Sequence, residues 1–320
     1  MGDAAGIGPE VVLKALGDPV VRRRGLPVLI GSHRVFQHQV SELGLKTPLR
    51  RCLSVDEIDW TGERINVLEP KKLPSGLPRP GRVDPAWAMA AMDCVAFGVE
   101  LTLQGTTVAL VTAPINKEGI HRAGFRYQGH TDFLAHLTRS PEAAMMLVGG
   151  KIRVVLATVH IPISRVSRSL FREGIASKIR LAFQVLVRMG FPSPRIAVAG
   201  LNPHAGEAGA FGKEEIEIIA PAVADCRREG IKVEGPLPPD TVFHRHYRGE
   251  FDAVVAMYHD QGLIPLKTLA FERGVNITLG LPLVRTSPDH GTAYELAGKG
   301  RANPRSMIEA IKLACRLVRR

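Results

Sequence analysis

Three histidines in this chain each stand just after a short apolar run. The run that begins at Ala253 stops at Tyr258-His259-Asp260-Gln261-Gly262, the run from Arg153 to Val159 leads into His160, and the run from Ile196 to Leu201 leads into Asn202-Pro203-His204. Short β-branched runs that end in polar residues are typical of buried parallel strands. Open α/β sheets bind their ligands at the carboxyl ends of such strands.

These histidines have two interpretations. If the three strand ends meet, three imidazoles converge on one point, which suits a divalent ion with positions left open for substrate. However, polar residues are expected near strand ends in any case, and a single histidine is more often a hydrogen-bonded structural residue. Spacing alone leaves both interpretations open.

The composition indicates a folded protein. The chain has 320 residues, of which 45% are hydrophobic and 23% are charged, so it is long enough for two domains or one large one. We expect no membrane span, because no segment approaches about 18 uninterrupted apolar residues. The N-terminus lacks a signal-peptide pattern, so a cytoplasmic location is predicted. The four scattered cysteines are expected to be small core residues in a reducing compartment.

The net charge of +11 suggests either nucleic acid or anionic small molecules as partners. The arginines are spread over several short groups and do not form one basic patch laced with aromatic residues. We therefore expect small anionic ligands and no nucleic acid.

Strand, loop and helix signals alternate along the chain, which predicts βαβ units in a mostly parallel sheet. The strands outside the histidine runs are expected over 26–31, over 107–112 and within 273–285, and the helices over 32–43, 84–103, 172–189 and 304–318, with one more starting near 213. A polar loop is expected over 286–293. The ordinary GxGxxG fingerprint after a strand is missing from the sequence.

Two loops precede helices and suit anions. The glycine-rich start, Met1-Gly-Asp-Ala-Ala-Gly-Ile-Gly-Pro-Glu10, has Pro9 where a helix begins. Such a turn either cradles phosphate or permits tight backbone packing, and we favour packing. The second loop is 127–132. There Thr131 or Asp132 can cap a helix, which would place a helix N-terminus beside His130. A plain capped helix with a solvated histidine is the alternative.

Several motifs together resemble the 4-hydroxythreonine-4-phosphate dehydrogenase family. They are Gly-Asp-Ala-Ala-Gly-Ile-Gly-Pro-Glu, Gly-His-Thr-Asp-Phe, Gly-Leu-Asn-Pro-His-Ala-Gly-Glu, Gly-Pro-Leu-Pro-Pro-Asp-Thr, Met-Tyr-His-Asp-Gln-Gly and Gly-Val-Asn-Ile-Thr-Leu-Gly-Leu-Pro. The resemblance implies a two-domain α/β/α fold like that of isocitrate and isopropylmalate dehydrogenases, with the active-site cleft between the domains. It predicts a first domain of 1–125 plus 265–320 and a second domain of 126–264.

The resemblance also implies the site residues. His160, His204 and His259 would bind the metal, and His130, Thr131, Lys267, Asn276 and Arg285 would hold a phosphorylated substrate. Lys267 and Asp260 are the candidate catalytic residues, Asp260 because it can orient a metal-bound imidazole. The resemblance further implies a homodimer in which each active site draws metal ligands from both subunits.

The segment 289–304 is similar to the cofactor loop of the isocitrate and isopropylmalate dehydrogenases. That similarity implies that His290, Gly291, Thr292 and Asn303 bind NAD or NADP. Relatives have a strand before the first glycine-rich loop, whereas this sequence begins at the loop. Either the start of the chain is trimmed in this sequence or another segment fills that sheet position. If the strand is absent, we expect the position to be unpaired or to be an edge.

The implied activity is metal-dependent oxidative decarboxylation of 4-phosphohydroxy-L-threonine by NAD(P), in pyridoxal phosphate (vitamin B6) biosynthesis. Three imidazoles suit zinc or cobalt better than magnesium, although the family is described with several divalent ions. The alternative is a dehydrogenase of D-threonate or D-erythronate 4-phosphate in sugar-acid catabolism. A more remote one is a non-catalytic metal- or phosphate-binding protein.

Overall fold

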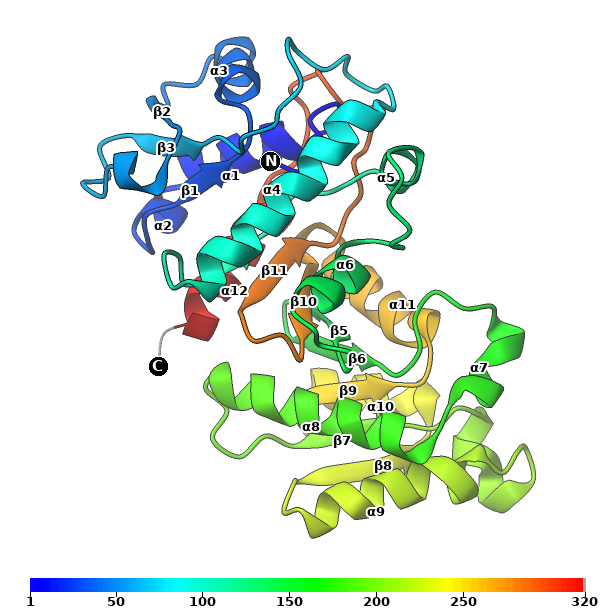
Figure 1. Cartoon of the computed structure of the whole chain (residues 1–320). Helices are drawn as coiled ribbons and strands as arrows, with labels where there is room; N and C mark the ends of the chain where they lie inside the picture. The colour runs from blue at the N-terminus through cyan, green and yellow to red at the C-terminus, as the bar shows by residue number, and fades with distance from the viewer. Residues whose placement is uncertain (319–320) are drawn as a thin grey trace. The chain divides into compact units, whose positions relative to one another are not determined.

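The computed structural model describes residues 1–318, and the chain divides into two compact units, whose elements are labelled in Figure 1. The first unit joins Met1–Pro141 to the segment that begins at Leu281, and the second unit is Glu142–Gly280. Both boundaries lie further along the chain than the predicted 125 and 264. As a result, His130 belongs to the first unit, whereas Lys267 and Asn276 belong to the second.

The first unit contains short parallel strands and the helices that cover them. Its elements are α1 (Gly8–Gly17), α2 (Pro19–Arg22), β1 (Val28–Ile30), α3 (His33–Glu42), β2 (Leu49–Cys52), η1 (Val55–Glu57), β3 (Ile65–Leu68), α4 (Pro85–Leu103), β4 (Leu110–Val111), α5 (Lys117–Arg122), α6 (His130–Leu137), β11 (Arg285–Pro288) and α12 (Arg305–Val318).

The second unit alternates strands and helices. Its elements are β5 (Ala144–Gly149), β6 (Ile152–Leu156), α7 (Ile163–Ser169), α8 (Arg172–Arg188), β7 (Ile196–Ala199), η2 (Pro203–Gly209), η3 (Glu215–Ile219), α9 (Ala220–Arg228), β8 (Val233–Leu237), α10 (Pro239–Tyr247), β9 (Ala253–Ala256), α11 (His259–Ala270), η4 (Phe271–Arg273) and β10 (Val275–Leu279).

The sheet of the second unit runs in the order β10-β5-β6-β9-β7-β8. Strands β6, β9, β7 and β8 are parallel, while β5 pairs antiparallel with both β10 and β6. Helix α8 lies on one face, and α10 and α11 lie on the other (Figure 1). All four residues of β7 and of β9 are buried, as expected for central strands covered on both faces. The sheet is mostly parallel, which confirms the predicted fold class.

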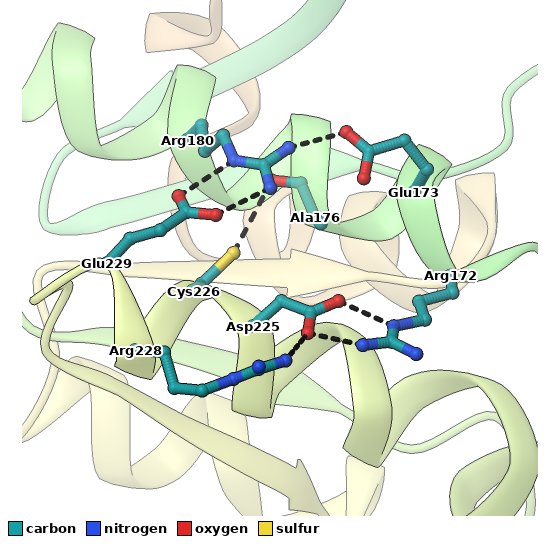
Figure 2. Close-up of polar contacts among 8 residues, drawn as sticks. All are labelled: Arg172, Glu173, Ala176, Arg180, Asp225, Cys226, Arg228 and Glu229. Atoms are coloured by element: carbon teal, nitrogen blue, oxygen red, sulfur yellow. Dashed lines mark hydrogen bonds and ion pairs between the residues drawn. The ribbon is translucent and has the colours of Figure 1, made fainter.

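Helices α8 and α9 are joined by a network of ion pairs, shown in Figure 2. Arg180 on α8 donates to both oxygens of Glu229, at 2.8 and 2.7 Å, and Arg172 pairs with Asp225 on α9. Cys226 lies buried beneath this network, and burial raises the pKa of its thiol to about 11. These ion pairs lie at the surface between the two helices, so each contributes at most about 1 kcal/mol to the stability of the fold.

Strands of the first unit pair in two groups. One has the order β1-β3-β2, and the other pairs β4 with β11; all of these pairs are parallel. A cavity of about 570 Å³ lies against both β1 and β4, and residues of α4 and α12 complete its lining. Within residues 1–318, no strand pairs with β1 or β4 across this cavity. The sheet position that the sequence left unassigned is therefore not filled by another described segment.

The N-terminal residue lies at one end of that cavity. The α-amine of Met1 donates to the carbonyl of Ile30 at 2.8 Å, and the backbone N–H of Asp3 donates to the carbonyl of Pro114 at 2.8 Å. Burial lowers the pKa of the Met1 amine. Residues 1–3 thus bond to the chain at the ends of β1 and β4, which fixes where the glycine-rich loop begins.

Helix α4 begins where the sequence predicts. Asp84 is its N-cap and accepts from the backbone N–H of Ala86 at 2.9 Å. By length and mean hydropathy alone this helix could also cross a membrane, although Asp93 and Glu100 interrupt its apolar residues. However, 56% of its apolar window is buried, and α4 packs against β1, β4 and α5. A buried core helix passes the same test, so the helix is weak evidence for a membrane.

Two sequence predictions about the first unit are wrong. The loop expected over 286–293 includes part of a strand, because Arg285–Pro288 forms β11 and all four of its residues are buried. The strand expected over 107–112 is only Leu110–Val111, and Val108 is 73% exposed. The polar composition of β11 concealed a buried strand, and β4 is short because it pairs on one side only.

Candidate active site

In the second unit, the three histidines follow three strands that lie side by side. Strand β9 pairs with β6 through Ala256 and Leu156, and with β7 through Val255 and Val198. Because the three strands are parallel, the residues after their carboxyl ends lie at one edge of the sheet.

The structure brings two of these histidines together. The ring centroids of His160 and His259 are 5.6 Å apart. His204 is exposed, and its ring lies 6.4 Å from that of Phe211. Within residues 1–318 no group of three or more His, Cys, Asp or Glu residues is close enough to hold a metal ion. The spacing left open whether the three imidazoles converge, and within residues 1–318 of one chain only those of His160 and His259 come together.

His259 is oriented by its neighbour. Nδ1 of His259 lies 2.7 Å from Oδ1 of Asp260, whose side chain is 70% exposed. A carboxylate bonded to Nδ1 favours the tautomer that presents an unprotonated Nε2, the form in which imidazole binds metals. The chemistry of the pair His160 and His259 therefore fits a divalent ion.

Lys267 lies on the helix that His259 begins, α11, and is partly buried. Its Nζ lies 5.9 Å from the ring centroid of Phe271. On β10 the side-chain Oδ1 of Asn276 is buried and has no hydrogen-bond partner within the described chain. Leaving such a group unpaired costs about 1–3 kcal/mol, and polar ligands commonly satisfy these atoms.

The turn that carries His204 has an unusual backbone. Five successive residues, 204–208, have positive φ angles between 42° and 82°, and only one of them is glycine. Left-handed helical conformation costs about 1–2 kcal/mol per non-glycine residue, so this turn stores about 4–8 kcal/mol. Contacts elsewhere must offset that cost, and strained backbone of this kind is concentrated at functional sites.

In the first unit, His130 is the first residue of α6 and follows the N-cap Gly129. The prediction that Thr131 or Asp132 caps this helix is wrong, because both lie within its first turn and no side chain caps it. Nε2 of His130 is buried without a hydrogen-bond partner among the described residues. Burial lowers the pKa of His130 well below its usual range, and the positive charge of Arg285 lowers it further.

Arg285 is almost fully buried, at 2% exposure, in strand β11. Its Nε and Nη2 donate to the hydroxyl of Thr112, at 3.2 and 2.6 Å. Burial lowers the pKa of this guanidinium to about 9. The charge of Arg285 acts on His130, so this part of the first unit is electropositive, which suits an anionic ligand.

The predicted cofactor loop packs against the glycine-rich start of the chain. The carbonyl of Thr292 accepts from the backbone N–H of Ile7 at 3.0 Å, and a Cβ at Gly6 would lie 2.8 Å from that carbonyl oxygen. The glycines at the start therefore permit close packing, which is the interpretation that the sequence favoured. Nothing in these contacts indicates a phosphate cradle.

The other residues of this loop have distinct environments. Nδ1 of His290 lies 3.0 Å from the carbonyl of Gly291, while its Nε2 is buried and unpaired within residues 1–318. Gly291 faces open space, and Asn303 accepts from the backbone N–H of Arg305 at the start of α12. The buried Nε2 of His290 is the feature that best fits a bound ligand here.

The motif analysis did not assign roles to two buried residues of the second unit, Glu215 and Gln261. Both hydrogen-bond to the chain next to the histidine-bearing turns. Gln261 falls within the polar cluster after β9, which could have singled it out. Glu215 lies among other acidic residues at a helix start, so nothing in the sequence distinguishes it.

Comparisons with known proteins cover nearly the whole chain. Residues 24–314 match the model of the family "Pyridoxal phosphate biosynthetic protein PdxA". A 4-hydroxythreonine-4-phosphate dehydrogenase from Desulforapulum autotrophicum is 44% identical over 98% of this chain and 93% of its own length. A D-threonate 4-phosphate dehydrogenase from Cupriavidus necator is 45% identical over 100% of this chain and 96% of its own.

A solved structure agrees with these relatives. The crystal structure of 4-hydroxythreonine-4-phosphate dehydrogenase from Klebsiella pneumoniae has a TM-score of 0.90 and 45% identity, and the match covers 100% of this chain and 97% of that one. The fold and these similarities define an α/β oxidoreductase of the dehydrogenase class. The chain belongs to the PdxA family of pyridoxal phosphate biosynthetic proteins. The resemblance inferred from the motifs is thereby confirmed.

Proposed function

We propose that this protein catalyses metal-dependent oxidative decarboxylation of 4-phosphohydroxy-L-threonine by NAD(P). The products would be 3-amino-2-oxopropyl phosphate, carbon dioxide and NAD(P)H, in pyridoxal phosphate (vitamin B6) biosynthesis. In this reaction the C3 carbon gives a hydride to the nicotinamide, and the hydroxyl on C3 releases a proton to the medium. The resulting 3-oxo acid then loses its carboxylate as carbon dioxide. The observation that carries this proposal is the end-to-end similarity to dehydrogenases of this name.

His160, His204 and His259 are the proposed metal ligands. The adjacent carboxyl ends of β6, β7 and β9 support this assignment, as does the 5.6 Å separation of the His160 and His259 rings. A divalent ion there would act as a Lewis acid on the substrate hydroxyl. Neutral nitrogen ligands suit zinc or cobalt better than magnesium.

The proposed substrate residues divide between the units. His130, Thr131 and Arg285 come from the first unit, and Lys267 and Asn276 from the second. Arginine makes forked bonds to phosphate or carboxylate, and lysine provides a point charge. Lys267 and Asp260 are the proposed catalytic residues, with Asp260 holding the ring of His259 in place.

NAD or NADP is the proposed hydride acceptor, held by His290, Gly291, Thr292 and Asn303. The buried, unpaired Nε2 of His290 supports a ligand at this loop.

We also propose a homodimer in the cytoplasm that binds neither nucleic acid nor membranes. The second unit exposes several large apolar side chains, including Ile163, Phe171, Phe211 and Ile216, and Phe211 lies beside His204. Exposed apolar side chains are candidates for burial in a protein interface. Ligands shared between subunits would also agree with the lack of a three-residue metal group in residues 1–318 of one chain.

The alternative substrate is a four-carbon acid phosphate, D-threonate or D-erythronate 4-phosphate. The similarity to the Cupriavidus necator dehydrogenase favours keeping this alternative. The same residues would hold its phosphate, and the two classes of substrate differ in the amine.

The test is formation of NADH or NADPH by purified protein with each of the three substrates. The protein is first treated with chelator, and zinc, cobalt or magnesium is then added back. Turnover on 4-phosphohydroxy-L-threonine that returns with metal is the expected result. Turnover on a sugar-acid phosphate alone would replace the proposed substrate, and activity that survives complete chelation would overturn the metal requirement.

A further inference from the structure

The buried side chain of Glu215 lies against the left-handed turn that carries His204. Glu215 is 2% exposed. Its Oε1 accepts from the backbone N–H groups of Leu201 and Asn202, at 2.8 and 2.7 Å, and its Oε2 accepts from the side-chain amide of Asn202 at 3.0 Å. These charge-assisted bonds are roughly twice as strong as bonds between neutral groups. The carboxylate therefore fixes the chain just before His204.

The contact between Glu215 and the turn is close. A Cβ at Gly206 would lie 2.7 Å from Oε2 of Glu215, so only glycine fits between the carboxylate and the turn. Gly206 also has a φ of +82°. The conformation of the turn and the position of the carboxylate thus depend on each other.

Gln261 holds the same segment from the neighbouring strand. It is 9% exposed, and its Oε1 accepts from the backbone N–H of Met257 at 2.6 Å. Its Nε2 donates to the carbonyl of Gly200 at 2.8 Å. One side chain therefore connects the end of β9, next to His259, to the end of β7, next to His204.

We propose that Glu215 and Gln261 are positioning residues that set where the imidazole of His204 lies relative to the rest of its subunit. This inference rests on the proposed metal site. Since the turn is strained, it has other, relaxed conformations available once its supports are lost, and His204 would then spend less time where a metal can bind. Neither residue would contact the metal or the substrate.

Glu214 provides a matched control. It is also a carboxylate bonded to the amide of Asn202, at 2.8 Å, and to the hydroxyl of Ser167, at 2.5 Å. It accepts no bond from the backbone of Leu201 or Asn202 among the contacts described for residues 1–318. Glu214→Gln therefore changes the same charge one residue away without removing the anchor of the turn.

The test is calorimetric titration with Co²⁺ of the whole protein after a chelator has removed its metal, together with turnover at low and at saturating Co²⁺. In Glu215→Gln the new amide faces the amide of Asn202, so two donors oppose each other. We expect the Kd for Co²⁺ to rise about 10- to 100-fold, as for other outer residues that support metal ligands. Turnover should recover to within about 3-fold at saturating Co²⁺, and Glu214→Gln should bind Co²⁺ as the parent protein does.

The melting temperature of the metal-free variant separates positioning from a general structural role, because Co²⁺ that binds only the folded state would also rescue a destabilised fold. We expect metal-free Glu215→Gln to melt as metal-free Glu214→Gln does. If Glu215→Gln does not fold, Gln261→Glu tests the same inference, since it keeps the bond from Met257 and loses the donor to Gly200. An unchanged Kd in the folded variant would overturn the inference. Absence of Co²⁺ binding by the parent protein would instead overturn the metal site of the proposed function.

Discussion

Strands β9 and β11 are both fully buried, yet they differ in where they hold their polar residues. Every residue of β9 is apolar, and its chemistry begins only after the strand ends, at His259. Strand β11 has the sequence Arg-Thr-Ser-Pro and carries its candidate residue, Arg285, within the buried strand itself. A residue placed after a strand costs the fold little, whereas a cation inside a strand must be removed from water.

This difference has consequences for stability. His259 is partly exposed, so replacing it should leave the fold intact. Arg285 is buried, and its lowered pKa means that the folded state disfavours its charge. The unfavourable contribution is fully present below pH 9 and is relieved as the pH rises from about 9 toward the ordinary range of arginine. Removing His259 should therefore leave the stability of the fold unchanged, whereas removing Arg285 should leave it unchanged or raise it.

The largest effect is expected after β9. His259→Ala should lower metal-dependent turnover by at least about 100-fold, because one of three proposed ligands is lost. Its melting temperature should stay within about 2 °C of the parent value. Steady-state assays and thermal melts measure both quantities, and His38→Ala, on the exposed surface of α3, is the control. Full activity in His259→Ala would remove this residue from the metal site.

The sequence predicted β9 and its histidine because an apolar run of β-branched residues followed by a polar cluster is specific to a buried strand end. It missed β11 for the opposite reason. Nothing in Arg-Thr-Ser-Pro indicates burial, which depends on β4 beside it and on α12 packed against it. The family motif, not the pattern, assigned Arg285.

The position of His204 was also beyond prediction. Its strand, β7, could be read from the sequence, but the left-handed turn after it depends on Glu215, which lies eleven residues further along the chain. Contacts between residues so far apart have no periodic signal. The glycine-rich start shows the converse, since its packing could be anticipated from the glycines alone.

A smaller loss of activity, with no loss of stability, is expected for a substitution within β11. Arg285→Met should raise KM for the phosphorylated substrate by at least about 10-fold, because a forked cation is lost. At pH 7 the melting temperature should stay equal or rise, since burial disfavours the charge of Arg285 in the folded state, as its lowered pKa indicates. Kinetics and thermal melts test this, with Arg126→Met on an exposed loop as the control. A large loss of stability would mean that the charge of Arg285 supports the fold.

Filling the cavity that lies against β1 and β4 should change the stability of the first unit. A five-residue apolar strand of alternating valine and alanine fused ahead of Met1 would extend toward the unpaired edges of β1 and β4. Valine side chains buried in the cavity and backbone bonds to the free strand edges would stabilise the fold, and the entropy of ordering the added strand would oppose this gain. We expect the melting temperature to rise by about 5 °C. A serine and glycine extension of equal length should have no effect, and equal melting for both would show that the cavity does not accept a strand.

The smallest effect concerns pH. The pKa of His130 is lower in the folded protein than in the unfolded chain, so the unfolded state binds more protons below about pH 6.5 and stability falls as the pH falls. His130→Asn should lose up to about 1.4 kcal/mol per pH unit of this dependence between pH 6.5 and 5. His246, whose pKa is also lowered by burial, remains in both proteins and contributes to the residual slope. Denaturant titrations at several pH values measure it, and identical slopes would mean that His130 is not buried as described.

The most direct measurement is the binding of Co²⁺ to chelated protein, followed by calorimetry and by the visible absorption of the bound ion. We predict one ion per chain in the parent protein, with binding lost in both His160→Ala and His259→Ala and retained in His38→Ala. Co²⁺ binding that survives both substitutions would contradict the assignment of the metal to the ends of β6 and β9.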